Sequence, residues 1–241
     1  NFYIEGLDLM KGRYGIATNN IDPNSISTIE VLENHQDIKA LKDLKPEERA
    51  SINLKLKSGV KGVFNLIATL GGGYVDKLLW DNELITTYFQ RNSQLLATYK
   101  GNNSGTDLES ELRSHTDYDY SRTSTISDIA MPATPGINKR YYYFNQSHSA
   151  TYNQVFRVGK NGELGINAAY LNDRDERSNQ SVTTTLLPDG SKNVVDESFN
   201  GILHRNIANG NITYMQNTER NYIKEQLKFD WLSTDGYSNI Y

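Results

Sequence analysis

The sequence predicts a mainly β fold, in which a small α+β unit over residues 1–58 is followed by long antiparallel strands over residues 59–241. Three observations predict it. Tyrosine is abundant at 16 residues while proline is limited to 5, which favours amphipathic strands joined by polar turns. From residue 60 onward, apolar and polar residues alternate with a period of two. Before residue 58, short segments of helical and of strand spacing are mixed.

The first unit is expected to contain short elements bounded by turn and cap residues. The segment 22–26 combines proline with Asp and Asn and predicts a turn or a single helical turn. The other expected elements are a strand at 2–6 that enters a turn, a strand at 27–32, a short helix capped by Asn34 and reaching Leu41, a helical start at 45–49 and an alternating strand at 50–57. We expect the buried face of this unit to carry Ile29, Val31, Ile52, Leu54 and Leu56.

Strand patterns fill most of the remaining chain and suggest about seven or eight strands. They lie at 64–70, 84–89, 94–100, 147–158, 163–170, 212–215 and 223–231. The glycines 71–73 suit a turn at a strand end, because G-x-G-x-x-G spacing and a following helix are missing for a phosphate site. The stretch 101–140 is polar, has no period and predicts a long loop. The hairpin at 147–172 is expected to open into a charged, solvated extension at 172–177.

The alternation separates an apolar face from a polar face. The apolar face carries Leu164, Ile166, Ala168, Tyr170, Leu227, Phe229 and Trp231, and the polar face carries Asn153, Arg157, Asn167, Lys224, Gln226 and Lys228. A soluble β-sandwich would turn the apolar face inward, whereas a membrane barrel would turn it to lipid. Strand length, long loops and aromatic residues near strand ends favour the barrel, but the pattern alone leaves both open. The aromatic residues in question are Tyr74, Trp80, Tyr99, Tyr170 and Trp231.

The N-terminal motifs resemble the C-terminal part of the plug in TonB-dependent outer-membrane receptors. The segment 29–41, Ile-Glu-Val-Leu-Glu-Asn-His-Gln-Asp-Ile-Lys-Ala-Leu, is similar to the "I-E-V-L" strand and short helix of that family, and it follows the turn at 22–26. The strand at 52–57 resembles the last plug strand, and Tyr3-Ile4-Glu5-Gly6 resembles a "Y-I-D-G" turn with Glu in place of Asp. The Asn34-His35-Gln36 variant resembles receptors that follow a carboxypeptidase-regulatory-like domain.

This resemblance implies a fold and a set of partners. Residues 1–58 would be the C-terminal part of a plug domain, and residues 59–241 the first strands of a partial transmembrane β-barrel of about 22 strands. The implied function is energy-coupled import of a glycan, peptide or metal chelate across the cell outer membrane. The implied partners are outer-membrane lipid, TonB bound through an N-terminal segment outside this chain, and a surface-exposed substrate-binding lipoprotein. We expect such a fragment to curl its sheet onto itself or to pair with a second copy.

Little catalytic chemistry is visible in the sequence. The chain has no Cys, its four His residues lack metal-ligand spacing, and no Ser-His-Asp set is seen, so we expect no metal, no cofactor and no enzymatic activity. A net charge of −4 argues against nucleic acid as a partner. The acidic run at 173–176 resembles a calcium loop but has Ser178 where Gly is needed.

One segment of the long loop is a candidate ligand site. It alternates acidic and aromatic residues that could hold a sugar by stacking and hydrogen bonding: Asp117, Tyr118, Asp119 and Tyr120. Two other function classes remain beside the importer. One is a soluble, secreted carbohydrate-binding sandwich, and the weaker one is a glycoside hydrolase fragment that uses two acids.

Overall fold

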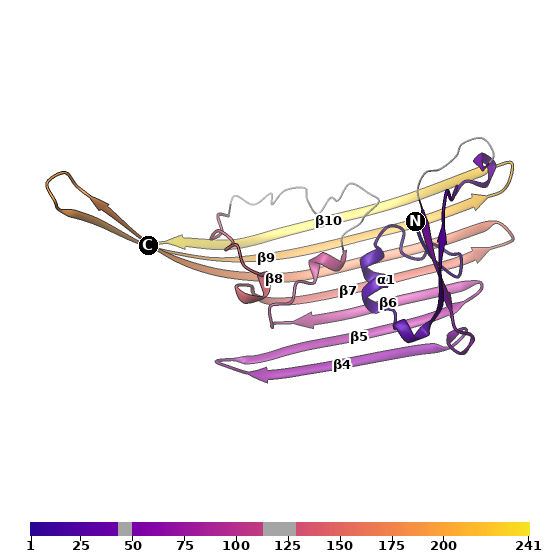
Figure 1. Cartoon of the computed structure of the whole chain (residues 1–241), viewed down its shortest axis with the longest axis horizontal. Helices are drawn as coiled ribbons and strands as arrows, with labels where there is room; N and C mark the ends of the chain where they lie inside the picture. The colour runs from indigo at the N-terminus through magenta and orange to yellow at the C-terminus, as the bar shows by residue number, and fades with distance from the viewer. Residues whose placement is uncertain (43–49, 113–128) are drawn as a thin grey trace.

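The computed structural model describes residues 1–42, 50–112 and 129–241. Strands account for 62% of the residues and helical segments for 11%, which confirms the mainly β class. In the described residues the strands form two sheets, a small one with the order β1-β3-β2 and a large one with the order β10-β9-β8-β7-β6-β5-β4. Figure 1 shows the large sheet as a ladder of long strands in sequence order, with the small unit near one end of them.

The small unit is built from short elements. These are β1 (Phe2–Ile4), α1 (Tyr14–Asn20), β2 (Ile26–Leu32) and β3 (Ser51–Leu56), with 3-10 turns at Pro23–Ser25, Lys39–Leu41 and Ser58–Val60. Strand β1 pairs with β3 in parallel, and β2 pairs with the other edge of β3 in antiparallel fashion. Asp22 caps the turn at Pro23–Ser25 by accepting a hydrogen bond from the Asn24 amide, as the sequence predicts.

One expectation for this unit is wrong, and one element was missed. The predicted helix at 34–41 is a single 3-10 turn at Lys39–Leu41, and α1 was not predicted. The predicted helical start at 45–49 lies outside the described residues. Helix α1 is hard to predict because it has only seven residues, includes Gly15 and lacks a side-chain cap.

The buried face of the small unit is also corrected. Leu54 and Leu56 are buried as expected, but Ile29, Val31 and Ile52 are 59%, 61% and 41% exposed. Ile29 and Val31 lie on β2, an edge strand of the small sheet, and Val31 is paired with Ile52 on β3. The core instead contains Phe2, Ile4, Leu7, Leu9, Met10, Ile16, Ala17 and Ile21, joined by Ile85, Phe89, Leu96 and Val155 of the large sheet.

The large sheet has seven strands in the described residues, each antiparallel to its neighbours. They are β4 (Phe64–Tyr74), β5 (Leu78–Gln90), β6 (Ser93–Asn102), β7 (Phe144–Val158), β8 (Gly162–Leu186), β9 (Lys192–Asn217) and β10 (Tyr222–Ile240). The strands are longer than the sequence pattern indicates. Gly71–73 lie inside β4 and not in a turn, and the charged run 172–177 continues β8 toward a hairpin that extends far beyond the sheet (Figure 1).

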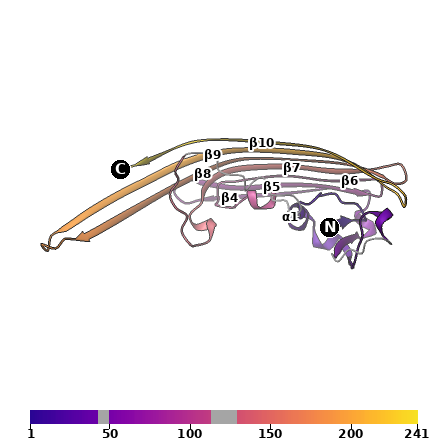
Figure 2. The same cartoon turned by 90° about the horizontal axis from the view of Figure 1, so that it is seen from above.

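The sheet is curved and open. Strands β4 and β10 are its two edges in the described residues, so the sheet does not curl onto itself, and the other expected outcome, pairing with a second copy, stays a prediction. Figure 2 shows the small unit against one side of the sheet near one end, while the opposite side carries no described element. The long loop between β6 and β7 contains 3-10 turns at Glu109–Leu112 and Lys139–Tyr141 on the same side as the small unit. We call this covered side the inner face and the opposite side the outer face.

Candidate functional site

The inner face of the large sheet is predominantly polar, yet much of it is buried. Each strand presents alternate residues to it, and many are amides, hydroxyls or acids with almost no exposure. The buried polar residues on this face are Thr87, Gln94, Thr98, Asn102, Asn145, Ser147, Ser149, Thr151, Asn153, Asn167, Asp173, Asp175 and Thr213. Arg157, which the sequence places on this face, is exposed. A soluble sheet would place its apolar residues in this covered position.

Amide side chains join the small unit to the inner face. Asn167 donates a 2.9 Å hydrogen bond to the carbonyl of Leu9, and Gln94 donates a 2.8 Å bond to the carbonyl of Ile4. A third contact, from Arg13 to Asn209, measures 2.5 Å. The first two bonds are accepted by backbone carbonyls of the small unit, and the third is accepted by the side chain of Asn209, so polar groups of both parts are paired where they meet.

A second set of contacts lies near the turn between β9 and β10. Asn217 donates to the carbonyl of Asp37 at 2.6 Å and accepts from the amide of Lys39 at 3.0 Å. The small unit therefore contacts β6, β8 and β9 by polar groups that surround the shared apolar cluster. Its position on the wall is fixed by directional bonds as well as by apolar burial.

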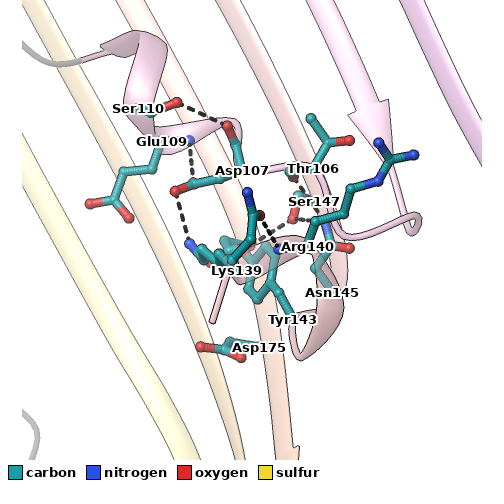
Figure 3. A network of polar contacts seen from close by, with 12 residues as sticks. Thr106, Asp107, Glu109, Ser110, Lys139, Arg140, Tyr143, Asn145, Ser147 and Asp175 are labelled. Atoms are coloured by element: carbon teal, nitrogen blue, oxygen red, sulfur yellow. Dashed lines mark hydrogen bonds and ion pairs between the residues drawn. The ribbon is translucent and has the colours of Figure 1, made fainter. Parts of the chain in front are cut away.

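A cluster of ionic and hydrogen-bonded groups connects the β6–β7 loop to the inner face (Figure 3). Arg205 on β9 bridges Asp173 at 2.6 Å and Glu109 of the loop at 3.0 Å. Tyr143 and Ser147 both donate hydrogen bonds to Oδ1 of Asp173, which is 2% exposed. One buried carboxylate thus receives three donors from three segments, an arrangement that holds the loop over the sheet.

Other polar contacts extend this cluster along the loop. Lys139 pairs with Asp107 at 3.0 Å (Figure 3). Asn145 donates to the Asn102 side chain at 2.9 Å. Lys100 lies between Glu83 and Glu111, with 2.8 Å to each. The loop also contacts the small unit. Glu111 lies so close to Gly15 of α1 that a Cβ added at Gly15 would be 3.5 Å from the Glu111 carbonyl oxygen.

The predicted ligand residues Asp117, Tyr118, Asp119 and Tyr120 lie outside the described residues. The acidic run at 173–176 is corrected, because Asp173 and Asp175 are buried and pair with Arg205 and Arg177. Sequence reasoning missed the Asp173–Arg205 pair. Its signal was the two-residue spacing of Asp173, Asp175 and Arg177, which share the face of Asn167. Within the described residues, no group of three acidic or imidazole side chains could hold a metal ion.

The outer face is apolar and exposed. Its residues align in rows across the strands, one of which runs Leu66, Thr86, Ala97, Tyr152, Ala168, Gly210 and Phe229. Phe64, Leu66, Leu227 and Phe229 are each at least 60% exposed. On β8 the apolar residues extend from Leu164 to Tyr170, or about 20 Å at ~3.4 Å per residue. The sequence therefore assigned the two faces of the sheet correctly.

A ring cluster marks one limit of this apolar band. Trp80 lies with its ring centroid 5.2 Å from that of His148, and the hydroxyl of Tyr99 is 2.9 Å from Nδ1 of His148. They pack over Gly101, where a Cβ would lie 2.9 Å from the Trp80 ring. The next outer positions on β8 and β9 are polar, and Asn172 donates to Asn206 at 2.7 Å.

Comparison with protein-family models, with curated proteins and with solved structures gave no match. In the described parts of the chain, no helix is both long enough and apolar enough to cross a membrane.

Proposed function

We propose that this chain is the plug-to-wall segment of a TonB-dependent outer-membrane receptor that imports a nutrient. The observation that carries the proposal is the polarity of the large sheet. Its polar face is covered by the small unit and the β6–β7 loop, while its apolar face is exposed. Water would oppose that arrangement, whereas lipid outside and a polar lumen inside would stabilise it.

The dimensions of the outer face support a membrane setting. The apolar band of about 20 Å along a strand is comparable to the outward apolar band of about 25 Å in outer-membrane barrels. Trp80 and Tyr99 lie at one limit of the band, where aromatic girdles are found in such barrels. The polar row that follows them suits the change from lipid to water.

The small unit would act as the plug. It lies on the polar inner face and is joined to it by the Asn167–Leu9 and Gln94–Ile4 hydrogen bonds. TonB would engage the receptor through an N-terminal segment outside this chain, and a surface-exposed lipoprotein would help deliver the substrate. The transported substrate would be a glycan, a peptide or a metal chelate.

The alternative, a soluble carbohydrate-binding sandwich, has less support. A sandwich core forms where two sheets bring their apolar faces together. Among the described residues, the only other sheet is the three-stranded one, and it lies on the polar side.

The proposal is tested by fractionating cells that produce the parent protein. Recovery in the outer membrane, together with loss of nutrient uptake when the gene is deleted, is the expected result. Release of the protein into the medium would contradict it and would favour the secreted module.

A further inference from the structure

A depression of about 430 Å³ lies on the outer face, beyond the apolar band and near the end of β7. The residues that line it include Lys77, Phe144, Glu176, Ser178, Asn200 and Tyr237. The strand register places Phe144, Glu176, Ile202 and Tyr237 in one row across β7, β8, β9 and β10. The depression is thus built on four adjacent strands and not on a loop.

The two aromatic side chains of this row are exposed. Phe144 is 56% exposed and Tyr237 is 59% exposed, so neither side chain is packed in a hydrophobic core. The ammonium group of Lys77 lies 5.7 Å from the centre of the Phe144 ring. With strands about 4.8 Å apart, the three intervals between the two aromatic positions span about 14 Å. That length accommodates several sugar rings side by side.

Polar groups lie between and beside the aromatic residues. Glu176 contributes a carboxylate, which also pairs with Arg174 at 3.0 Å. Ser178 and Asn200 are paired residues in the next row and contribute a hydroxyl and an amide. The set offers both donors and acceptors, as a ligand that carries many hydroxyl groups requires.

Other ligand classes fit this chemistry less well. A phosphate or another anion would meet the Glu176 carboxylate as well as the Lys77 ammonium and would leave the aromatic rings unused, and one carboxylate is too few for a cation site. An acyl chain would meet charged and polar groups at a cost. A saccharide has apolar C–H faces that stack on aromatic rings and a rim of hydroxyls that pair with carboxylate, amide and ammonium groups.

The depression is separate from the ionic cluster on the inner face. The backbone of the sheet forms the floor of the depression. At Gly201 the inner side of this floor is covered by the loop, because an added Cβ would lie 2.6 Å from the sulfur of Met131 and 3.2 Å from Pro132. The side chain of Arg177 pairs with Asp175 on the inner face. A ligand in the depression therefore does not reach Asp173 or Arg205.

We propose that this outer depression is a saccharide-binding subsite in which Phe144 and Tyr237 supply stacking platforms and Glu176 and Asn200 pair with sugar hydroxyls. The saccharide can be a free oligosaccharide or the headgroup of a glycolipid, because both present the same chemistry to the site. The inference does not depend on a transport role, since it rests on the depression itself.

The test measures binding to the intact protein in detergent with two probes. Maltohexaose represents a free neutral oligosaccharide, and the deacylated core oligosaccharide of lipopolysaccharide represents a glycolipid headgroup. Saturation-transfer NMR and calorimetric titration report contact and affinity. The variants are Phe144→Leu and Tyr237→Leu, which keep an apolar side chain but remove the ring. The matched control is Tyr152→Leu, within the apolar band of the same face.

We expect at least one probe to bind, with each of the two variants weakening binding about tenfold and the control leaving it unchanged. Binding of maltohexaose would identify a free oligosaccharide as a ligand, and binding of the core oligosaccharide alone would identify a headgroup. Absence of binding by both probes would overturn the proposal. Equal affinity in wild type and both ring-removal variants would overturn it as well. If fractionation places the protein outside the membrane, the proposed transport function fails, but binding that depends on Phe144 and Tyr237 would still support the saccharide subsite.

Discussion

The side-chain amide of Asn167 donates a 2.9 Å hydrogen bond to the backbone carbonyl of Leu9 across 158 positions of sequence. It joins the large sheet to the small unit on a face that would be solvated if the sheet stood alone. Asn167 also donates to Asn153 at 2.9 Å, so the contact is part of a short chain of amides. A polar wall can thus hold a separate unit by satisfying its backbone acceptors.

Removing this amide should weaken the docking of the small unit. Asn167→Ala leaves the Leu9 carbonyl without its side-chain donor, at a cost of about 1–3 kcal/mol. We expect the weaker docking to appear as faster proteolysis within residues 1–42 of the intact protein. The control Gln180→Ala removes an amide on the exposed β8–β9 hairpin, where Gln180 contacts Asp196, and should leave the rate unchanged. Equal rates in wild type and Asn167→Ala would count against a holding role.

The stability of the small unit should depend on Leu54 and not on Val31. Leu54 is 6% exposed, whereas Val31 is 61% exposed on the outer strand β2. Leu54→Ala should lower the free energy of unfolding of the unit by about 2–5 kcal/mol. Val31→Ala should change it by about 0.5 kcal/mol or less. Denaturant titration followed by pulse proteolysis measures both, and similar losses for the two variants would show that β2 is covered after all.

Asp8 should stabilise the small unit as pH falls, whereas Glu5, whose pKa is lowered, despite burial, by the Leu56 amide and Lys61, contributes in the opposite direction. Burial raises the pKa of Asp8, and Asp37 adds to this, while the Lys11 ammonium at 3.9 Å and the Lys11 amide oppose it. At pH values between the usual pKa of a carboxyl group and the raised pKa of Asp8, Asp8 of the folded unit is protonated, whereas Asp8 of the unfolded chain has lost its proton. The contribution of Asp8 to the free energy of unfolding therefore rises as pH falls through this window.

The variant Asp8→Asn tests this dependence. It should remove the rise, while Asp230→Asn on β10 should leave it intact. Thermal or denaturant unfolding at a series of pH values gives the slope for each protein. A slope in Asp8→Asn that equals the wild-type slope would assign the effect to another group.

The β6–β7 loop should depend on the buried Asp173–Arg205 pair. Asp173→Ala leaves Arg205 partly buried with only Glu109 as its ionic partner, and removing one member of a buried pair costs about 3–5 kcal/mol. Amide hydrogen exchange at residues 103–112 should then become faster. Asp196→Ala, in the distant β8–β9 hairpin, is the matched loss of one negative charge from an exposed position. Unchanged exchange in Asp173→Ala would show that other contacts hold the loop.

The fold of the large sheet was predictable because its signal is local. Alternation between apolar and polar residues, as in Leu164 to Tyr170, gives both the strand and its two faces. Strand ends were less visible, because Gly71–73 and the charged run at 172–177 suggest turns in isolation. In the structure, pairing with neighbouring strands keeps both segments extended.

The contacts of the inner face could not be predicted in the same way. Asn167 and Leu9 are 158 positions apart, and their contact is set by the docking of separate elements. Asp173 and Arg205 lie opposite each other on β8 and β9, so their pairing depends on the register of that hairpin. The exposure of Val31 follows equally from tertiary arrangement, because a strand pattern does not reveal which strand lies at an edge. Helix α1 depends on burial of Ile16 and Ala17 and has little local preference of its own.

The most direct test of the account compares two adjacent residues of β10 in the full receptor. Phe229 is 60% exposed on the outer face, and Lys228 lies on the opposite face. Phe229→Cys and Lys228→Cys are labelled in intact outer membranes with a lipid-soluble probe and with a polar probe. The account predicts that Phe229→Cys reacts with the lipid-soluble probe and Lys228→Cys only with the polar one. The reverse pattern would contradict the assigned faces, and equal reaction of both with the polar probe would contradict a membrane location.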